Sequence, residues 1–215
     1  MRAFIAISMQ TKEFVQSLLD RHLVVFKIND VIKVLNTSRS YAKLFIHRCV
    51  KKEIVCRVER GVYYLKTYAN EYEIASNILS PSYVSLISAL AYYGLTTQIP
   101  RVVYVVSTKR HKMIRNVEGF DILFRHVKKD LMFGYHKELN GNLFIADPEK
   151  AIVDIYYFNE VNDLDEDVLR KPPRINISKL LMYAKQSRSK RVAKGVAELL
   201  RKNGHGREAK ELEIE

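Results

Sequence analysis

The chain of 215 residues is strongly basic, with 36 Lys and Arg against 24 Asp and Glu and a formal charge of +12. Hydrophobic residues make up 47% of it, which is ample for a buried core and excludes an intrinsically disordered chain. It has no long apolar run, no secretion signal and no zinc-type cysteine spacing, so we expect a cytoplasmic protein without a membrane span, metal or cofactor.

The positive charge is concentrated at the two ends of the chain. Residues 1–70 carry 13 Lys and Arg against 5 acids, residues 71–160 carry 10 of each, and residues 161–215 carry 13 against 9. Two cationic regions around a neutral middle suggest contact with a polyanion at two places. We predict one domain over 1–69 and a second over 70–215, whose basic helical part begins at about residue 161.

The first 35 residues contain two helical patterns. An amphipathic stretch over 11–23 predicts the first helix, and Asp30 is suited to be the N-cap of a second helix ending at Leu35. Residues 36–38 then have the length of a turn between two crossed helices.

A third helix is predicted over 38–52. Ala42, Phe45, Ile46 and Cys49 follow the i, i+3, i+4, i+7 spacing of a half-buried helix, so this face is expected to pack in the core. Polar and cationic residues occupy the other side, where they suit phosphate oxygens and base edges. The candidate DNA-binding residues of this helix are Ser38, Arg39, Ser40, Lys43, His47 and Arg48.

Two short strands, 54–58 and 62–66, are predicted around the tight pair Arg60-Gly61. Arg57 and Arg60 lie near the tip of this ribbon and complete the set of candidate DNA-binding residues. Tyr63 and Tyr64 alternate along a strand, so one of them should pack inward. Helices followed by a basic ribbon are typical of a winged helix-turn-helix, and we therefore predict that this domain binds double-stranded DNA.

The rest of the chain is predicted to be a mixed α+β domain. Helices are expected over 70–79, up to Ser80-Pro81, and from about Tyr83 to a left-handed Gly94. Asp147 and Pro148 suit the start of a helix that ends at about Phe158. Four strands are expected to form an antiparallel sheet, the last two joined by Asn140-Gly141 as a type I′ turn: 102–107, 120–127, 131–139 and 143–146.

Two basic segments of this second domain are candidates for a further polyanion contact. The loop with Lys109, Arg110 and Lys112 follows a strand and has no packing reason to be so basic, although it could be a solvated connection. The last helices are expected over 176–186 and 188–202, and the second carries Lys190, Arg191 and Lys194 on its polar faces. Such a helix also suits the protein surface or a protein partner.

A catalytic role has little support in the sequence. Asp121, Asp147 and Glu149 could hold a metal ion in a nuclease, but Lys150 follows Glu149 directly, and Pro148 indicates a helix start. Lys150 and Asp154 are spaced to form a pair on one helix. We predict no catalytic or metal-binding residue; a metal-dependent nuclease and a protein-interaction module without sequence-specific DNA binding remain alternatives.

Several motifs of the middle region occur in the order seen in one family. They are Pro81-Ser82-Tyr83-Val84-Ser85-Leu86, Tyr92-Tyr93-Gly94-Leu95, Ser107-Thr108-Lys109-Arg110, Phe124-Arg125-His126, Phe133-Gly134-Tyr135, and Ile145-Ala146-Asp147-Pro148-Glu149-Lys150-Ala151 with Asp154. Over about residues 10–160 the chain resembles the AbiEi-like antitoxins of type IV toxin-antitoxin systems. The resemblance implies an N-terminal winged helix that represses its own operon. It also implies a downstream domain that opposes a nucleotidyltransferase-type toxin without forming a stable complex with it.

Overall fold

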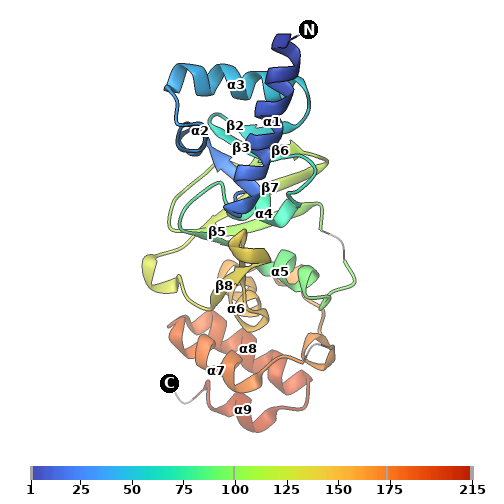
Figure 1. Ribbon diagram of the computed structural model, residues 1–215. Coiled ribbons are helices and arrows are strands. Elements are labelled where there is room, and N and C mark those ends of the chain that lie inside the picture. The colour runs from blue at the N-terminus through green and yellow to red at the C-terminus, as the bar shows by residue number, and fades with distance from the viewer. Residues whose placement is uncertain (1, 99, 173, 214–215) are drawn as a thin grey trace. The chain divides into compact units, whose positions relative to one another are not determined.

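The computed structural model describes residues 2–98, 100–172 and 174–213 of this mixed α+β protein (Figure 1). Contacts divide the chain into two compact units. Unit 1 comprises residues 1–78 and 137–143, and unit 2 comprises residues 79–136 and 144–215.

Unit 1 begins with three helices and a small sheet. Helix α1 (Arg2–Asp20) leads to strand β1 (Val25–Lys27), helix α2 (Ile28–Leu35) and helix α3 (Arg39–Lys51). Strands β2 (Val55–Glu59) and β3 (Val62–Leu65) follow, and the antiparallel sheet has the order β1-β3-β2. Helix α4 (Glu71–Ser76) starts at Asn70, whose side chain accepts a hydrogen bond from the backbone of Glu73.

The core of unit 1 joins all three long helices to the sheet. Phe14 of α1 meets Phe26 of β1 and Phe45 of α3 edge-on, with ring centroids 5.9 and 5.0 Å apart. Edge-to-face contacts of this kind add to the burial of the rings. The predicted three-helix core and hairpin are confirmed, whereas β1 was not predicted. The prediction for Asp30 was wrong, because it lies within the first turn of α2 and its carboxylate accepts a hydrogen bond from the backbone N–H of Lys27 at 2.8 Å.

Unit 2 contains most of a sheet with the strand order β6-β7-β5-β4-β9-β8, of which residues 137, 138 and 143 are counted with unit 1. Its strands are β4 (Ser82–Val84), β5 (Val102–Ser107), β6 (Ile114–Val117), β7 (Phe120–His126), β8 (Tyr135–Glu138) and β9 (Leu143–Ala146). The prediction of an antiparallel sheet was wrong, because β5 pairs with β7, and β4 with β9, in parallel. The predicted type I′ turn is confirmed within the short 3-10 segment Leu139–Gly141: Asn140 and Gly141 have φ values of +55° and +88°, and the C=O of Leu139 accepts a hydrogen bond from the N–H of Asn142 at 3.1 Å.

The helices of unit 2 pack against one another in chain order. Helix α5 (Leu86–Tyr92) contacts α6 (Pro148–Phe158), which also contacts α7 (Ile177–Gln186) and α8 (Lys190–Lys202), and α9 (Gly206–Lys210) packs on α8. The helix expected from Tyr83 begins later, because Ser82–Val84 forms a strand instead. Gly94 has the predicted left-handed conformation, with φ at +69°.

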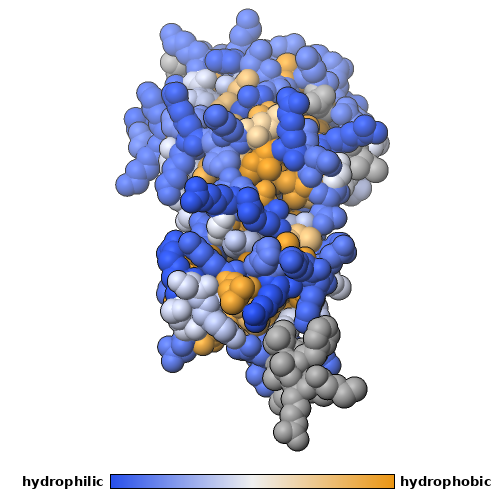
Figure 2. Space-filling view, turned by 90° about the horizontal axis from the view of Figure 1, so that it is seen from above, coloured by the Kyte–Doolittle hydropathy of each residue, from blue (hydrophilic) through white to orange (hydrophobic). Residues whose placement is uncertain are grey.

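Unit 2 also contains three short 3-10 turns, at Lys129–Leu131, Val161–Asp163 and Val168–Arg170. The first lies where the predicted strand 131–139 should begin, and only its later half forms β8. Within the described residues, no helix is both long and apolar enough to cross a membrane. The surface seen in Figure 2 is largely hydrophilic, with hydrophobic residues gathered in small areas.

Candidate nucleic-acid interface

Helix α3 is fixed in unit 1 by its apolar face. The predicted core residues of this face are each at most 2% exposed, namely Ala42, Phe45, Ile46 and Cys49. The helix starts at Ser38, whose hydroxyl accepts a hydrogen bond from the backbone N–H of Tyr41 at 3.3 Å and satisfies one of the free donors of the first turn. Because the inner face is buried, the opposite face of α3 is turned to solvent.

The hairpin of β2 and β3 lies beside this helix. Val55 and Val62 are buried on the side of the hairpin that faces the core, and the chain reverses at Arg60 and Gly61. Gly61 has a φ of +86°, a conformation that residues with a Cβ rarely adopt. The inward valines hold the hairpin on the core, while Arg57 and the turn residue Arg60 remain exposed.

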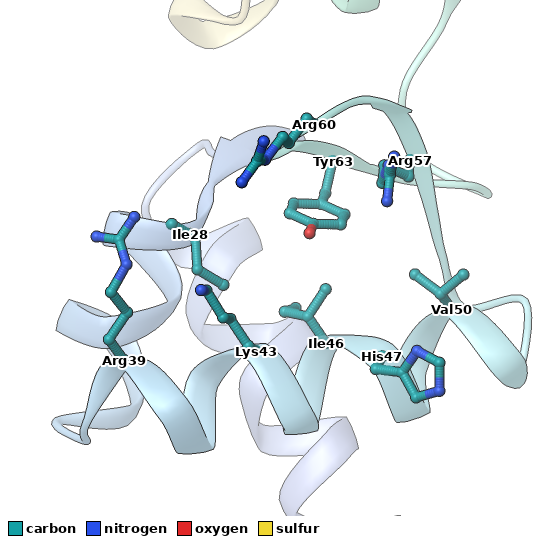
Figure 3. Close-up of a pocket in the computed structure, with 10 residues that line it drawn as sticks. Ile28, Arg39, Lys43, Ile46, His47, Val50, Arg57, Arg60 and Tyr63 are labelled. Atoms are coloured by element: carbon teal, nitrogen blue, oxygen red, sulfur yellow. The ribbon is translucent and has the colours of Figure 1, made fainter.

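A groove of about 520 Å³ separates α3 from the hairpin (Figure 3). Four side chains form its apolar floor: Ile28, Ile46, Val50 and Tyr63. Five basic side chains surround this floor: Arg39, Lys43 and His47 from α3, and Arg57 and Arg60 from the hairpin. None of the ten lining residues, which also include Gly61, carries a carboxylate. The groove therefore presents a cationic rim from two independent elements to a ligand.

One of these basic side chains, Arg39, forms a hydrogen bond within unit 1. The guanidinium of Arg39 donates a hydrogen bond to the side-chain oxygen of Asn29, on α2, at 3.3 Å. Asn29 is uncharged, so this contact orients the guanidinium without neutralising its charge. A guanidinium held in this way keeps further donors for an anionic ligand.

The structure brings together five of the eight residues predicted from the sequence to bind DNA. Arg39, Lys43, His47, Arg57 and Arg60 line the same groove. The other three, all exposed on or at the start of α3, do not line it: Ser38, Ser40 and Arg48.

Among the lining residues that were not predicted, Tyr63 is the one that the sequence pattern came closest to identifying. The alternation along the strand predicted that one of Tyr63 and Tyr64 packs inward, and Tyr64 is only 3% exposed. The ring of Tyr63 stacks on Phe26, with centroids 6.1 Å apart, and its other side faces Lys43 and Ile46 across the groove (Figure 3). No local signal identified Ile28 and Val50 as parts of the floor.

The basic loop of unit 2 lies at one edge of the sheet. Strands β5 and β7 are parallel and in register, with Ser107 beside His126, so the segments that follow them emerge at the same edge. The first segment carries Lys109, Arg110 and Lys112, and the second adds two lysines that were not predicted to take part, Lys128 and Lys129; all five are exposed.

A separate cleft of unit 2 connects this edge to the last helices. It has a volume of about 730 Å³, and its lining includes Lys128 and Arg188, the second of which precedes α8. The predicted residues Lys190, Arg191 and Lys194 are exposed on α8 but do not line this cleft.

The pair Lys150–Asp154 forms as predicted but is deeply buried. The two side chains, four residues apart on α6, are 0% and 3% exposed and form an ion pair. The Asp154 carboxylate also accepts hydrogen bonds from Ser85 Oγ at 2.7 Å and from Tyr83 Oη at 3.1 Å. Burial and the nearby carboxylate raise the pKa of Tyr83 well above its usual value. The Lys150 ammonium lies 4.8 Å from the ring centre of Phe133, which adds a cation–π contact.

Asp147 precedes α6, as predicted, but its side chain does not cap the helix. One carboxylate oxygen contacts Nδ1 of His136 at 2.8 Å, and the other accepts a hydrogen bond from Tyr183 Oη at 2.7 Å and contacts Lys179 Nζ at 3.0 Å. Burial raises the pKa of Asp147, but these hydrogen bonds and the Lys179 charge outweigh it and lower the pKa below its usual value. Asp147 thus ties α6 to the strand β8 and to α7.

Glu149, another of the three acids considered for a nuclease, also has a contact within unit 2. Its carboxylate accepts a hydrogen bond from the backbone N–H of Asn176, the N-cap of α7, at 2.8 Å. Among the described residues, no three His, Cys, Asp or Glu side chains are grouped so as to hold a metal ion. Comparisons of the chain with protein-family models and with curated proteins find no match.

Proposed function

We propose that unit 1 is a winged helix-turn-helix that binds double-stranded DNA, with α3 in the major groove and the β2–β3 hairpin as the wing. The order of its elements, α1, β1, α2, α3, β2 and β3, is the order of such domains. The observation that carries the proposal is the groove whose cationic rim comes from both α3 and the hairpin. A duplex backbone presents phosphates along its length, and cations on both sides of a groove suit that pattern.

The two walls of the groove have different tasks in this proposal. Arg39, Lys43 and His47 lie on a helix, which fits the width of the major groove and brings side chains to base edges. Arg57 and Arg60 lie on a hairpin whose backbone turns at a glycine, and they reach phosphates without reading sequence. DNA specificity would then reside in α3, and a large part of the affinity in the hairpin.

We extend the proposal to a transcriptional autorepressor and antitoxin without enzymatic activity. The chain would bind its own promoter and oppose a nucleotidyltransferase-like toxin without forming a stable complex with it. The support is the resemblance to AbiEi-like antitoxins, whose motif residues here meet in one buried network around Lys150 and Asp154. Residues of this kind maintain the framework of unit 2, so its exposed surface is where antagonism would arise.

We also propose that the sheet edge with Lys109, Arg110 and Lys112 contacts a polyanion. The register of β5 and β7 supports this, because it adds Lys128 and Lys129 to the same edge. Five neighbouring cations on exposed segments suit phosphates, and the contact would carry no sequence information. Lys190, Arg191 and Lys194 on α8 belong to this proposal as a second basic surface of unit 2.

Binding to the DNA upstream of the chain's own gene tests the first proposal. The full chain should bind that duplex more tightly than a shuffled duplex of the same composition. About six phosphate contacts would give a slope near −5 in a plot of log affinity against log salt concentration. Equal affinity for both duplexes at every salt concentration would refute a sequence-specific repressor. Repression of a reporter and rescue from a co-expressed toxin, each with Arg39→Ala as the variant, would then separate the two roles.

A further inference from the structure

The side of α3 that lies farthest from the core carries an exposed apolar residue, Leu44, among polar and charged ones. Ser40, Leu44, His47 and Lys51 are spaced i, i+4, i+7 and i+11, so they form a single stripe along the helix. All four are exposed, and the stripe lies opposite the buried face that includes Ala42 and Cys49. Leu44, at its centre, is 47% exposed although its neighbours on the stripe are polar or charged.

The other exposed apolar residue of this helix is accounted for by contacts within unit 1. Tyr41 donates a hydrogen bond from its hydroxyl to the side-chain oxygen of Gln10 at 3.1 Å, and its ring stacks on Phe45. Leu44 lies between Ser40 and Arg48, one turn away on either side, on the solvent side of the helix. Transfer of apolar surface out of water is favourable, so burying the Leu44 side chain against a ligand would contribute to binding.

The major groove offers one apolar feature to such a side chain. Base edges there present hydrogen-bond donors and acceptors, and only thymine adds a methyl group. We propose that Leu44 contacts the methyl group of a thymine in the sequence that α3 reads, and so determines specificity at that base pair. This inference rests on the proposed DNA binding of unit 1 and names the base class that one position of its helix recognises.

The test uses the full chain and a duplex selected by it from a random pool of DNA. Each thymine of the selected duplex is replaced in turn by uracil, which removes the methyl group and leaves base pairing unchanged. At one position the wild-type chain should lose about fourfold in affinity, the value expected for one buried methyl group. Leu44→Ala should bind the thymine and uracil duplexes equally well. Leu139→Ala, which removes another exposed leucine of unit 1, should keep the wild-type preference.

The outcomes separate the inference from the proposal on which it rests. Failure of the full chain to select any sequence would refute the proposed function and this inference with it. Selection of a sequence without any uracil penalty would leave DNA binding intact and overturn the role of Leu44. A penalty that persists in Leu44→Ala would also overturn it. So would a change from dimer to monomer in Leu44→Ala, because Leu44 would then contact a second copy of the chain.

Discussion

Replacing Lys150 by Met should destabilise the protein far more than its position on a helix suggests. Methionine keeps most of the length of the side chain but removes the ammonium, so the Asp154 carboxylate remains buried without its counter-charge. Breaking a buried ion pair by removing one partner costs about 3–5 kcal/mol. Tyr83 and Ser85 still donate to Asp154, so we expect a loss of about 3 kcal/mol, the lower end of that range.

Lys202→Met is the matched control for this variant. Lys202 lies four residues after Glu198 on α8, with 4.0 Å between Nζ and Oε1, and its Nζ also contacts Glu166 Oε1 at 2.8 Å, but its side chain is 49% exposed. Exposed pairs of this kind contribute little to stability, because water screens both charges. The same lysine-to-methionine change should therefore have a small effect at this position.

Urea unfolding followed by circular dichroism measures both variants, because the chain has no tryptophan for fluorescence. With a slope of about 1–3 kcal/mol per molar urea, Lys150→Met should lower the midpoint by about 1–3 M. Lys150→Met combined with Asp154→Asn removes both charges and keeps an acceptor for Tyr83 and Ser85, so it should recover part of the loss. Equal midpoints for Lys150→Met and Lys202→Met would refute the reasoning that this pair lies in a dry interior.

Three further predictions concern the hairpin, the cysteines and Asp147. Replacing Arg57 and Arg60 together by Gln should reduce the salt slope of DNA binding by about 1.8 and leave sequence preference unchanged; an altered preference in a competition assay would contradict a backbone role. Burial raises the pKa of Cys49 to about 11, so only about one thiol in a thousand is ionised at pH 8. Iodoacetamide should therefore modify Cys56 first, as peptide mass spectrometry would show; equal labelling would disprove the burial. Asp147→Asn should lower the urea midpoint at pH 7. The pKa of Asp147 is lower in the folded protein than in the unfolded chain, where it is near 3.8, so its charge stabilises the fold at any pH above 3.8. That difference should shrink as the pH falls below 3.8, and a constant difference would count against the charge contacts.

The fold of unit 1 was largely predictable because its signals are local. The stripe from Ala42 to Cys49 and the serine before it specify both the helix and its buried face. The hairpin follows from two short apolar runs around Gly61. Strand β1 was missed because Val25–Lys27 is only three residues long and pairs with β3, far along the chain. The groove between α3 and the hairpin could not be predicted either, because it depends on how the hairpin lies beside the helix.

Long-range pairing explains the errors in unit 2. Residues 114–117 contain Arg115 and Asn116 and did not suggest a strand, yet β6 forms the edge beside β7 and leaves β7 free to pair in parallel with β5. The ion pair of Lys150 and Asp154 follows from their spacing, but its burial does not. It results from Tyr83 on β4 and from Phe133 in the segment before β8, both of which contact the pair.

Mapping the DNA contact by nuclear magnetic resonance tests the central claim most directly. The ¹⁵N-labelled full chain would be titrated with the duplex from upstream of its own gene, and shift changes would be recorded for each backbone amide. We predict that the largest changes cluster on α3 and the β2–β3 hairpin, around Arg39, Lys43, His47, Arg57 and Arg60. Changes centred on unit 2, or none at saturating duplex, would contradict the assignment of this groove as the DNA-binding surface.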